Sequence, residues 1–284
     1  MQCAKCPGES VIFQQYSGLH LCKTHFIADV EAKAKRDIRV NGWLRSGDHI
    51  GILMTGDKKS LALFHFICRL VASRRDVRVT AIITKGGGGE SPGAGTFQHI
   101  VESSGITVVH APADALASAI GEDGESASPV LAGIARENGM TKFAEGRCLD
   151  DAALSFLAAI LSGKPEPFFD DDWGDFQDLP IITPFMSVPV SEIELYADFS
   201  TGACIIPPGE RGHDVFRERV RDMLDAYTGR HPATKYSLLQ ISERIRHAKP
   251  GNGTPVRTGS GLGKFSRELC NPERGSGEVK HHGE

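Results

Sequence analysis

Short apolar runs alternate with segments of helical periodicity between residues 49 and 163. The predicted strands are 49–54, 77–84, 106–111 and 141–146, and the predicted helices are 61–73, 96–105, 130–139 and 149–163. Strands that alternate with helices along the chain are joined by right-handed crossovers and therefore run parallel. The sequence predicts an α/β fold in which helices cover a parallel sheet.

Three of the seven cysteines lie near the amino terminus and form the pattern C-x2-C-x15-C-x2-H with a histidine. The four residues are Cys3, Cys6, Cys22 and His25. Two chelating pairs suit tetrahedral Zn2+, and four protein ligands leave no position for water, which is typical of a structural site. The alternative is a set of reduced free thiols. We predict a zinc ribbon over residues 1–28, with Gly18 in a hairpin turn and metal binding as the main source of its folding free energy.

Composition narrows the class of protein. Hydrophobic residues make up 40% of the 284 residues and charged residues 24%, which is typical of a globular chain. No apolar run reaches the roughly 20 residues of a membrane span, and MQCAKCPGES lacks the apolar core of a signal peptide, so we expect a cytoplasmic protein without a membrane partner. In a cytosolic protein, paired cysteines bind metal more often than they form disulfides.

Charge is unevenly distributed along the chain. Residues 211–284 hold 14 Lys and Arg against 9 Asp and Glu, a net charge of +5, whereas residues 1–210 hold 18 against 27, a net charge of −9. The basic segment could face a polyanion, or its charges could belong to ordinary solvated helix surfaces. Charge alone does not decide between nucleic acid and solvent.

The loop TGDKKS, residues 55–60, follows the first predicted strand. Ligands bind at the carboxyl ends of the strands in an open parallel sheet, which makes this loop the natural place for one. A loop that enters a helix can hold phosphate on its backbone N–H groups. The spacing is not that of a Walker A loop.

The order of zinc ribbon, helix, strand and phosphate loop resembles the N-type ATP pyrophosphatases (PP-loop proteins), and within them the tRNA 2-thiouridine synthetase family of tRNA sulfurtransferases. That family's loop reads SGGKDS, in register with TGDKKS. Its second motif, K-x-A-T-G-H-N-L-D-D, is matched in part by KFAEGRCLDD at residues 142–151. The segments VPVSEIELYA and HPATKYSLLQISERI are similar to the family's later regions. The chain is identified as a degenerate member over residues 1–247.

The resemblance implies a domain order and a set of ligands. It implies an adenine nucleotide alpha hydrolase-like PP-loop domain at 29–190, a helical tRNA-binding region at 191–250, and a flexible tail with an eroded second zinc ribbon at 251–284. It implies ATP and Mg2+ as ligands, with nucleotide contacts from Thr55, Gly56, Lys58, Ser60, Lys142, Asp150 and Asp151. Family enzymes adenylate a uridine of tRNA and then transfer sulfur to it. The implied partners are tRNA, a sulfur-carrier protein, and a second copy of the chain or a partner subunit.

The chain departs from the family pattern at the loop. Asp57 replaces a glycine and Lys59 replaces an aspartate. A carboxylate in an anion-binding loop repels phosphate. Asp57 followed by Ser60 is favourable chemistry for the start of a helix, so we interpret this change as a helix cap.

The sulfur-handling cysteines also depart from the pattern. The family's C-x2-C pair is absent before residue 130, and Cys204 lies about six residues before the third family position, so we do not expect an iron–sulfur cluster. Cys148 and Cys204 are the candidate catalytic residues. Cys148 is a candidate because Arg147 beside it and the helix start after it lower a thiol pKa. The alternative for Cys204 is a buried structural thiol.

Three functions remain open. The first is an ATP-dependent tRNA 2-thiolation enzyme with impaired or altered catalysis. The second is a non-catalytic paralog that binds tRNA or an active partner subunit, and the missing cysteines favour it over the first. The third is a nucleotide-binding protein with unrelated chemistry on the same sheet.

Overall fold

The computed structural model describes residues 1–55, 57–84, 94–112, 129–163, 175–176, 179–201 and 214–247. All of them belong to one compact unit that spans Met1–Lys249. The predicted tail at 251–284 lies outside the described residues. Among the helices that the structure describes, none combines the length and the apolar character that a membrane span requires.

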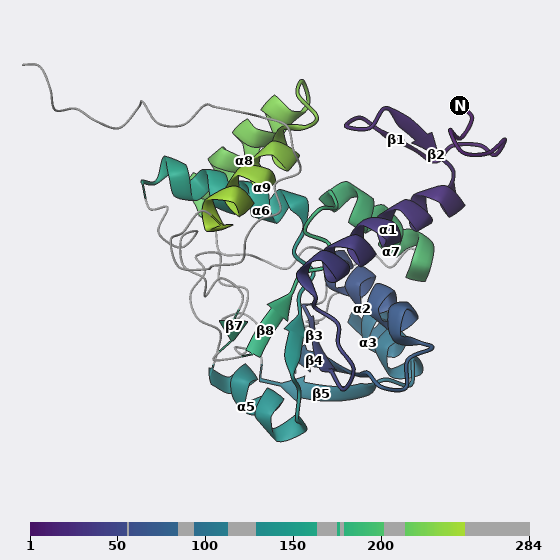
Figure 1. The fold of residues 1–284 in the computed structure, drawn as a ribbon, viewed down its shortest axis with the longest axis vertical. Coiled ribbons are helices and arrows are strands. Elements are labelled where there is room, and N and C mark those ends of the chain that lie inside the picture. The colour runs from purple at the N-terminus through teal and green to yellow at the C-terminus, as the bar shows by residue number, and fades with distance from the viewer. Residues whose placement is uncertain are drawn as a thin grey trace, which may run out of the picture. The chain divides into compact units, whose positions relative to one another are not determined.

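Figure 1 shows the order of the elements. The strands are β1 (Ile12–Gln14), β2 (Leu19–Leu21), β3 (His49–Met54), β4 (Arg78–Thr84), β5 (Thr107–Ala111), β6 (Lys142–Ala144), β7 (Asp175–Phe176) and β8 (Leu179–Ile182). The helices are α1 (Lys23–Asn41), α2 (Lys58–Val71), α3 (Ala94–Ser103), α5 (Pro129–Asn138), α6 (Leu149–Leu161), α7 (Val190–Thr201), α8 (Val215–Thr228) and α9 (Thr234–His247).

The central sheet has the strand order β5-β4-β3-β6-β8-β7. Five of its strands are parallel, and only β7 pairs antiparallel, with β8. The predicted α/β fold with a parallel sheet is therefore confirmed, and its four predicted strands are all present. Strands β7 and β8 are additional. A four-residue strand that contains Pro180 gives a weak sequence signal. Proline is tolerated in β8 because only the two-residue strand β7 pairs with β8 on the outer side of the sheet.

Helices cover both faces of the sheet (Figure 1). Ile50 and Ile52 of β3 belong to a core with residues of α1, α2 and α7. Leu53 faces the other way and packs with Leu131 and Ala135 of α5. All six residues of β3 are buried. A strand covered on both faces reads as a continuous apolar run, and this explains why the sequence located it so clearly.

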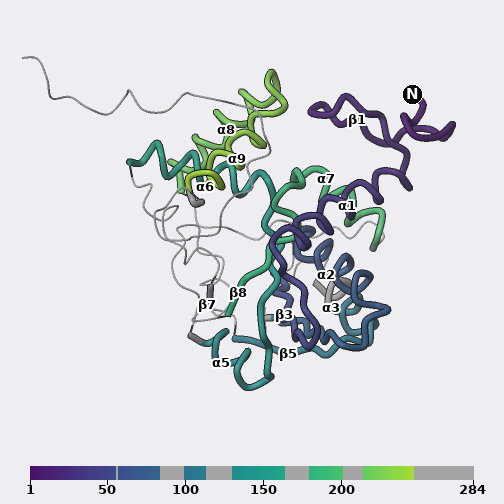
Figure 2. The backbone as a smooth tube through the Cα atoms, viewed as in Figure 1, coloured from purple at the N-terminus to yellow at the C-terminus, as the bar shows by residue number. Residues whose placement is uncertain are grey.

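Helix α6 joins the sheet to the last two helices. Figure 2 shows α8 and α9 beside α6, which follows β6 in the chain. Ala153 of α6 packs with Val220 and Leu224 of α8, and Leu149 packs with Leu239 of α9. Helix α6 therefore connects the sheet to the carboxy-terminal helices α8 and α9.

Gly51 marks a place where the sheet has no room for a side chain. A Cβ atom there would lie 2.6 Å from Sδ of Met140 and 3.0 Å from Cδ1 of Phe143. We expect Gly51→Ala to lower the free energy of unfolding by about 1–3 kcal/mol, because an overpacked core forces side chains out of their preferred rotamers. Urea unfolding followed by circular dichroism measures this change.

Gly133→Ala is the matched control. Gly133 lies in α5, and a Cβ atom there meets nothing within 4 Å. Replacing a helical glycine by alanine is expected to be neutral or to stabilise the protein by up to about 1 kcal/mol. If both variants unfold at the wild-type urea concentration, the close packing described around Gly51 is wrong.

Candidate functional site

The amino-terminal ribbon brings its four predicted ligands together. Strands β1 and β2 pair antiparallel, with Gly18 in the turn at φ 68°, and Cys22 is the N-cap of α1. The ligand atoms of Cys3, Cys6, Cys22 and His25 all lie within 4.8 Å of one another. Sγ of Cys22 is 3.3 Å from Nδ1 of His25 and 3.6 Å from Sγ of Cys6. Tetrahedral ligands are about 3.5 Å apart around a small ion, so this group could hold a metal ion.

The hydrogen bonds of the ribbon favour the thiolate form of one ligand. Burial opposes ionisation of Cys3, but hydrogen bonds from the backbone of Cys22 and Lys5, and from the side chains of Cys22 and His25, lower its pKa to about 6. Metal ligation requires thiolates, so this environment is suited to it.

A polar cluster fastens the ribbon to α1 and α7. Nε2 of Gln14 donates to Oδ2 of Asp29 at 2.9 Å and to Oε1 of Glu192 at 3.1 Å. The hydroxyl of Tyr16 donates to Oε1 of Glu192 at 2.7 Å, and Nζ of Lys33 lies 3.0 Å from Oε2. Burial and the nearby Glu192 carboxylate raise the pKa of Tyr16 above its usual value. Gln14 and Glu192 are 178 positions apart, and no sequence pattern indicated this contact.

The loop at residues 55–60 forms the cap of α2. Oδ1 of Asp57 accepts hydrogen bonds from the backbone N–H of Ser60 at 2.8 Å and from Oγ1 of Thr55 at 2.9 Å. Oγ of Ser60 donates to the carbonyl of Asp57 at 2.9 Å. The interpretation of Asp57 and Ser60 as a helix cap is confirmed. Gly56 lies outside the described residues.

Both lysines of the loop have carboxylate partners. Nζ of Lys58 lies 2.7 Å from Oδ1 of Asp198 in α7. Nζ of Lys59 lies 2.8 Å from Oδ2 of Asp151 in the first turn of α6. Burial acts to lower the pKa of Lys59, but the Asp151 carboxylate outweighs it and raises that pKa above the usual value. Each lysine is therefore a charged member of an ion pair.

Asp151 is the centre of this network. Its Oδ2 accepts hydrogen bonds from the backbone N–H and the thiol of Cys148, both at 3.0 Å, which closes a capping box at the start of α6. Burial acts to raise the pKa of Asp151, but Lys59 and Cys148 hold it below its usual value. The structure thus places Asp151 beside the loop through its ion pair with Lys59.

The environment of Cys148 differs from the one we expected. The side chain is fully buried, and burial together with the Asp151 carboxylate raises the thiol pKa well above its ordinary value. Nε of Arg147 lies 3.1 Å from Oε1 of Glu145. The expectation of a lowered pKa at Cys148 is therefore wrong, because the neighbouring arginine pairs with Glu145 while a carboxylate faces the sulfur. Cys204, the other candidate, lies outside the described residues.

Gly146 allows the turn before α6 to touch the loop. A Cβ atom on Gly146 would lie 3.0 Å from the carbonyl carbon and oxygen of Lys59. Those are backbone atoms at the start of α2, which cannot move without disturbing the cap. Gly146 therefore permits a close approach between the second motif, residues 142–151, and the loop at residues 55–60.

Lys142 lies away from the loop. Its Nζ is 2.8 Å from Oδ2 of Asp48, the residue before β3, and donates to the carbonyl of Trp43 at 2.8 Å. Because β3 and β6 are parallel, this is the amino-terminal edge of the sheet, whereas Thr55 follows the carboxyl end of β3. The structure does not bring Lys142 together with the other predicted nucleotide-binding residues.

Asp150 connects helices instead of facing the loop. Its Oδ2 accepts the backbone N–H of Val190 at 2.7 Å, and its Oδ1 lies 2.5 Å from Nζ of Lys235 in α9. Lys235 also contacts Asp225 of α8 at 2.6 Å. These pairs tie α6 to α7, α8 and α9. No sequence pattern indicated Asp198 or Lys235, because their partners are 140 and 85 positions away.

Comparison with known proteins agrees with this architecture. A family model described as the 2-thiouridine synthetase TtuA, N-terminal LIM domain, matches residues 2–27. The chain is 26% identical over 280 residues to the tRNA 2-thiolation protein NcsA of Haloferax volcanii, covering 86% of this chain and 87% of that protein. It is 22% identical over 274 residues to a probable sulfurtransferase of Methanocaldococcus jannaschii, covering 84% and 77%. These matches confirm the resemblance predicted from the sequence.

A solved structure shares the fold. The U34-tRNA thiolase NcsA from Methanococcus maripaludis, solved with its [4Fe-4S] cluster, superposes with a TM-score of 0.72 at 21% identity and covers 88% of this chain and 89% of its own. This finding overturns our cofactor expectation, which named structural Zn2+ with ATP and Mg2+ and set aside an iron–sulfur cluster. The expectation against a cluster rested on cysteines missing at the family's positions, and the expectation of zinc rested on the donor set of the ribbon. Soft donor sets suit both zinc and iron–sulfur centres, so the donor type of the ribbon does not separate the two.

The ribbon cluster predicts metal loss on substitution of one ligand. We expect Cys22→Ser to reduce bound metal from about one equivalent per chain to a small fraction of that, because a closed four-ligand site loses both charge and geometry with one thiolate. Inductively coupled plasma mass spectrometry of the purified protein measures the stoichiometry and identifies the element. Cys68→Ser is the matched control, since Cys68 lies in α2 outside the cluster. Full metal retention in Cys22→Ser contradicts the assignment.

The buried thiol of Cys148 predicts slow alkylation. Burial raises the pKa of Cys68 to about 11, and burial together with the Asp151 carboxylate raises the pKa of Cys148 well above its ordinary value. We expect iodoacetamide at neutral pH to label Cys148 at least about tenfold more slowly than Cys68, because the Cys148 side chain is fully buried whereas that of Cys68 is partly exposed. Peptide mass spectrometry gives both rates, and labelling in urea, where the two rates should converge, is the control. Rapid labelling of Cys148 in the folded protein is the contrary result.

Proposed function

We propose that this relative of the tRNA 2-thiouridine synthetases binds tRNA through its helical region 191–250 and that its ATP-dependent step is impaired. The tRNA part rests on the name of the Haloferax volcanii relative, a tRNA 2-thiolation protein, whose alignment covers 86% of this chain. The impaired step rests on the described loop. One observation carries this part: the carboxylate of Asp57 occupies the start of α2, where a phosphate would bind.

The cap on α2 competes directly with a phosphate. A helix start attracts anions because its first N–H groups lack partners within the helix and because the helix dipole is positive there. Asp57 already accepts the N–H of Ser60 at 2.8 Å. A phosphate entering the loop would lose that donor and would lie beside a like charge. Both effects weaken nucleotide binding.

The two lysine pairs add to this cost. For Lys58 or Lys59 to meet a phosphate, each must leave its partner, Asp198 or Asp151. The side chain of Lys59 is only 15% exposed and that of Asp151 29% exposed, so the carboxylate left behind would be poorly solvated. Separating a partly buried pair is unfavourable for that reason. The Lys59–Asp151 pair therefore favours the loop as it stands, without nucleotide.

The ribbon and the carboxy-terminal helices supply the remaining functions in this proposal. The cluster of Cys3, Cys6, Cys22 and His25 holds a metal ion that stabilises the ribbon, because a hairpin this short has no core of its own. Residues 214–247 contain seven Lys and Arg against five Asp and Glu. Contacts between such cations and phosphates provide most of the affinity for structured RNA. Proteins recognise structured RNA largely by the shape of its backbone.

The experiment measures tRNA binding and ATP turnover in the same preparation. We expect the full-length protein to bind tRNA in a filter assay, and to release little AMP or pyrophosphate from ATP with tRNA and sulfide present. Asp57→Asn should tighten ATP binding at least about tenfold by isothermal titration calorimetry, because asparagine keeps the cap and removes the like charge.

Asp57→Ala is the matched control. It removes the charge and the cap together and is expected to cost about 1 kcal/mol of stability, so comparing it with Asp57→Asn separates repulsion from capping. Micromolar ATP binding and tRNA-dependent pyrophosphate release by the wild type would contradict the impaired step and favour an active enzyme supplied with sulfur by a carrier protein. Failure of the wild type to bind tRNA would contradict the tRNA part.

A further inference from the structure

Helix α8 has faces of different character. Val220 and Leu224 are buried and pack against α6. Successive helical residues are rotated by about 100°, which places the carboxylates of Glu218, Asp222 and Asp225 together on a second, solvent-facing side. The acidic residues of the helix are thus concentrated away from the rest of its exposed surface.

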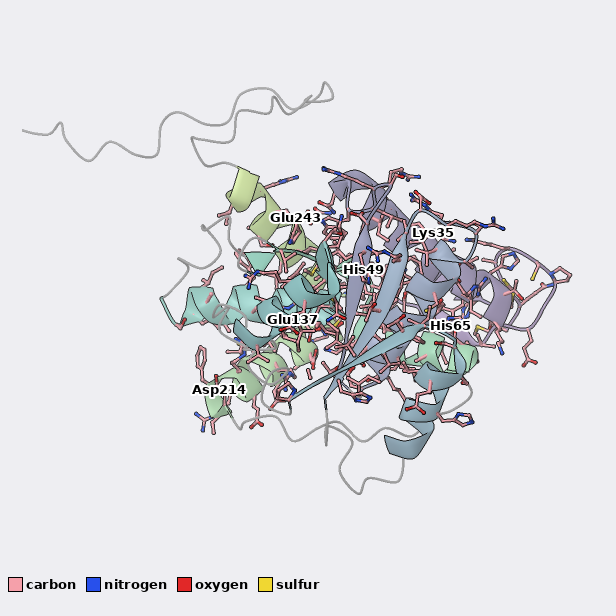
Figure 3. All side chains as sticks on the ribbon, turned by 90° about the horizontal axis from the view of Figure 1, so that it is seen from below. Lys35, His49, His65, Glu137, Asp214 and Glu243 are labelled. Atoms are coloured by element: carbon pink, nitrogen blue, oxygen red, sulfur yellow. The ribbon has the colours of Figure 1, made fainter. Side chains whose placement is uncertain are left out.

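A third face of the same helix combines apolar and cationic side chains. It carries Phe216, Arg219, Met223, Tyr227 and, just beyond the helix end, Arg230, which we call the aromatic–arginine stripe. Phe216 is 43% exposed, Met223 50% and Tyr227 51%. Asp214 is the N-cap of α8, next to the first residue of the stripe. In Figure 3, Asp214 lies on one side of His49 in β3, and Lys35 and His65 lie on the other side.

The stripe ends in an open hollow at the turn between α8 and α9. The hollow has a volume of about 490 Å³ and is lined by Tyr227, Arg230, His231, Thr234 and neighbouring residues. The rings of Tyr227 and His231 lie 4.5 Å apart between centroids with an interplanar angle of 30°. The volume lies in the range of about 300–1,000 Å³ that is usual for small-ligand sites. The walls offer an aromatic surface and a guanidinium group.

The arginines of the stripe differ from the lysines of the body. Lys33, Lys58, Lys59, Lys142 and Lys235 all form ion pairs. Within the part of the chain that the structure describes, Arg219 and Arg230 have no carboxylate within ion-pair distance. Their charge is therefore available to an anionic partner. Guanidinium groups bind phosphate in a bidentate manner and stack on aromatic rings, which favours a nucleic acid over an apolar protein surface.

We propose that the aromatic–arginine stripe and its hollow bind an unpaired nucleotide of the tRNA. The base stacks in the hollow against Tyr227 and His231, and Arg230 contacts a flanking phosphate. Proteins recognise unpaired RNA bases by stacking them on aromatic side chains, whereas paired bases are not accessible in this way. This inference rests on the proposed tRNA-binding function and adds to it the place of contact and the kind of nucleotide.

The experiment compares RNA affinities of full-length variants by fluorescence anisotropy. The probes are a tRNA transcript, a short single-stranded RNA, and the same sequence closed into a duplex hairpin. We expect Tyr227→Ala to weaken binding of the tRNA and the single strand by about five- to fiftyfold, since stacking on one aromatic ring contributes affinity in that range. The duplex should show little change. Tyr227→Phe should bind like the wild type, because the ring is retained.

Arg230 is tested through the salt dependence of binding. We expect Arg230→Gln to reduce the steepness of log affinity against log salt concentration by about 0.7–1, because one phosphate contact is lost. Arg136→Gln is the matched control, since it removes the same charge from an exposed position in α5. It should leave the salt dependence unchanged.

The outcomes separate this inference from the function on which it rests. If the wild type binds tRNA but Tyr227→Ala and Arg230→Gln bind it equally well, the contact is wrong, the stripe serves another partner or none, and the tRNA-binding function stands. Equal weakening of the duplex and the single strand also overturns the claim of an unpaired nucleotide. If the wild type binds none of the three RNAs, both proposals fail.

Discussion

The carboxylate of Asp151 is the point on which the candidate site depends. It accepts the backbone N–H of Cys148, the N-cap of α6, and at the same time pairs with Lys59 at the start of α2. One side chain therefore fixes the position of α6 on the loop. Because α8 and α9 pack against α6, the arrangement of the carboxy-terminal helices also depends on the Asp151–Lys59 pair.

That dependence gives the altered loop a structural role. The family's loop pattern has a glycine where this chain has Asp57, and an aspartate where it has Lys59. The first change caps α2 and the second supplies the partner of Asp151. Both departures from the family pattern thus form contacts within the protein. A nucleotide that binds this loop must first break its internal ion pairs, which reduces the free energy of binding. For this reason we connect the paired loop with the proposed impairment of the ATP-dependent step.

Much of the fold and part of the site could be predicted from the sequence. The buried strand β3, the strand β4, helix α2 between them, the four clustered ligands of the ribbon and the cap at Asp57 all depend on local patterns that survive folding. The pKa of Cys148 could not be predicted from its neighbours. Arg147 is adjacent in sequence but pairs with Glu145, and the sulfur faces Asp151 instead. Sequence proximity was a poor guide to electrostatic environment.

The sequence by itself determined the order of strands and helices between residues 49 and 163, the donor set of the ribbon and the resemblance to the tRNA 2-thiouridine synthetases. These depend on residue type and short spacing. Only the tertiary structure decided that Lys142 lies at the edge of the sheet opposite the loop, that Asp150 joins helices, and that arginines and exposed aromatic rings share one face of α8. The physical reason is that ion pairs and exposed faces are set by contacts between distant segments, which short sequence patterns do not specify.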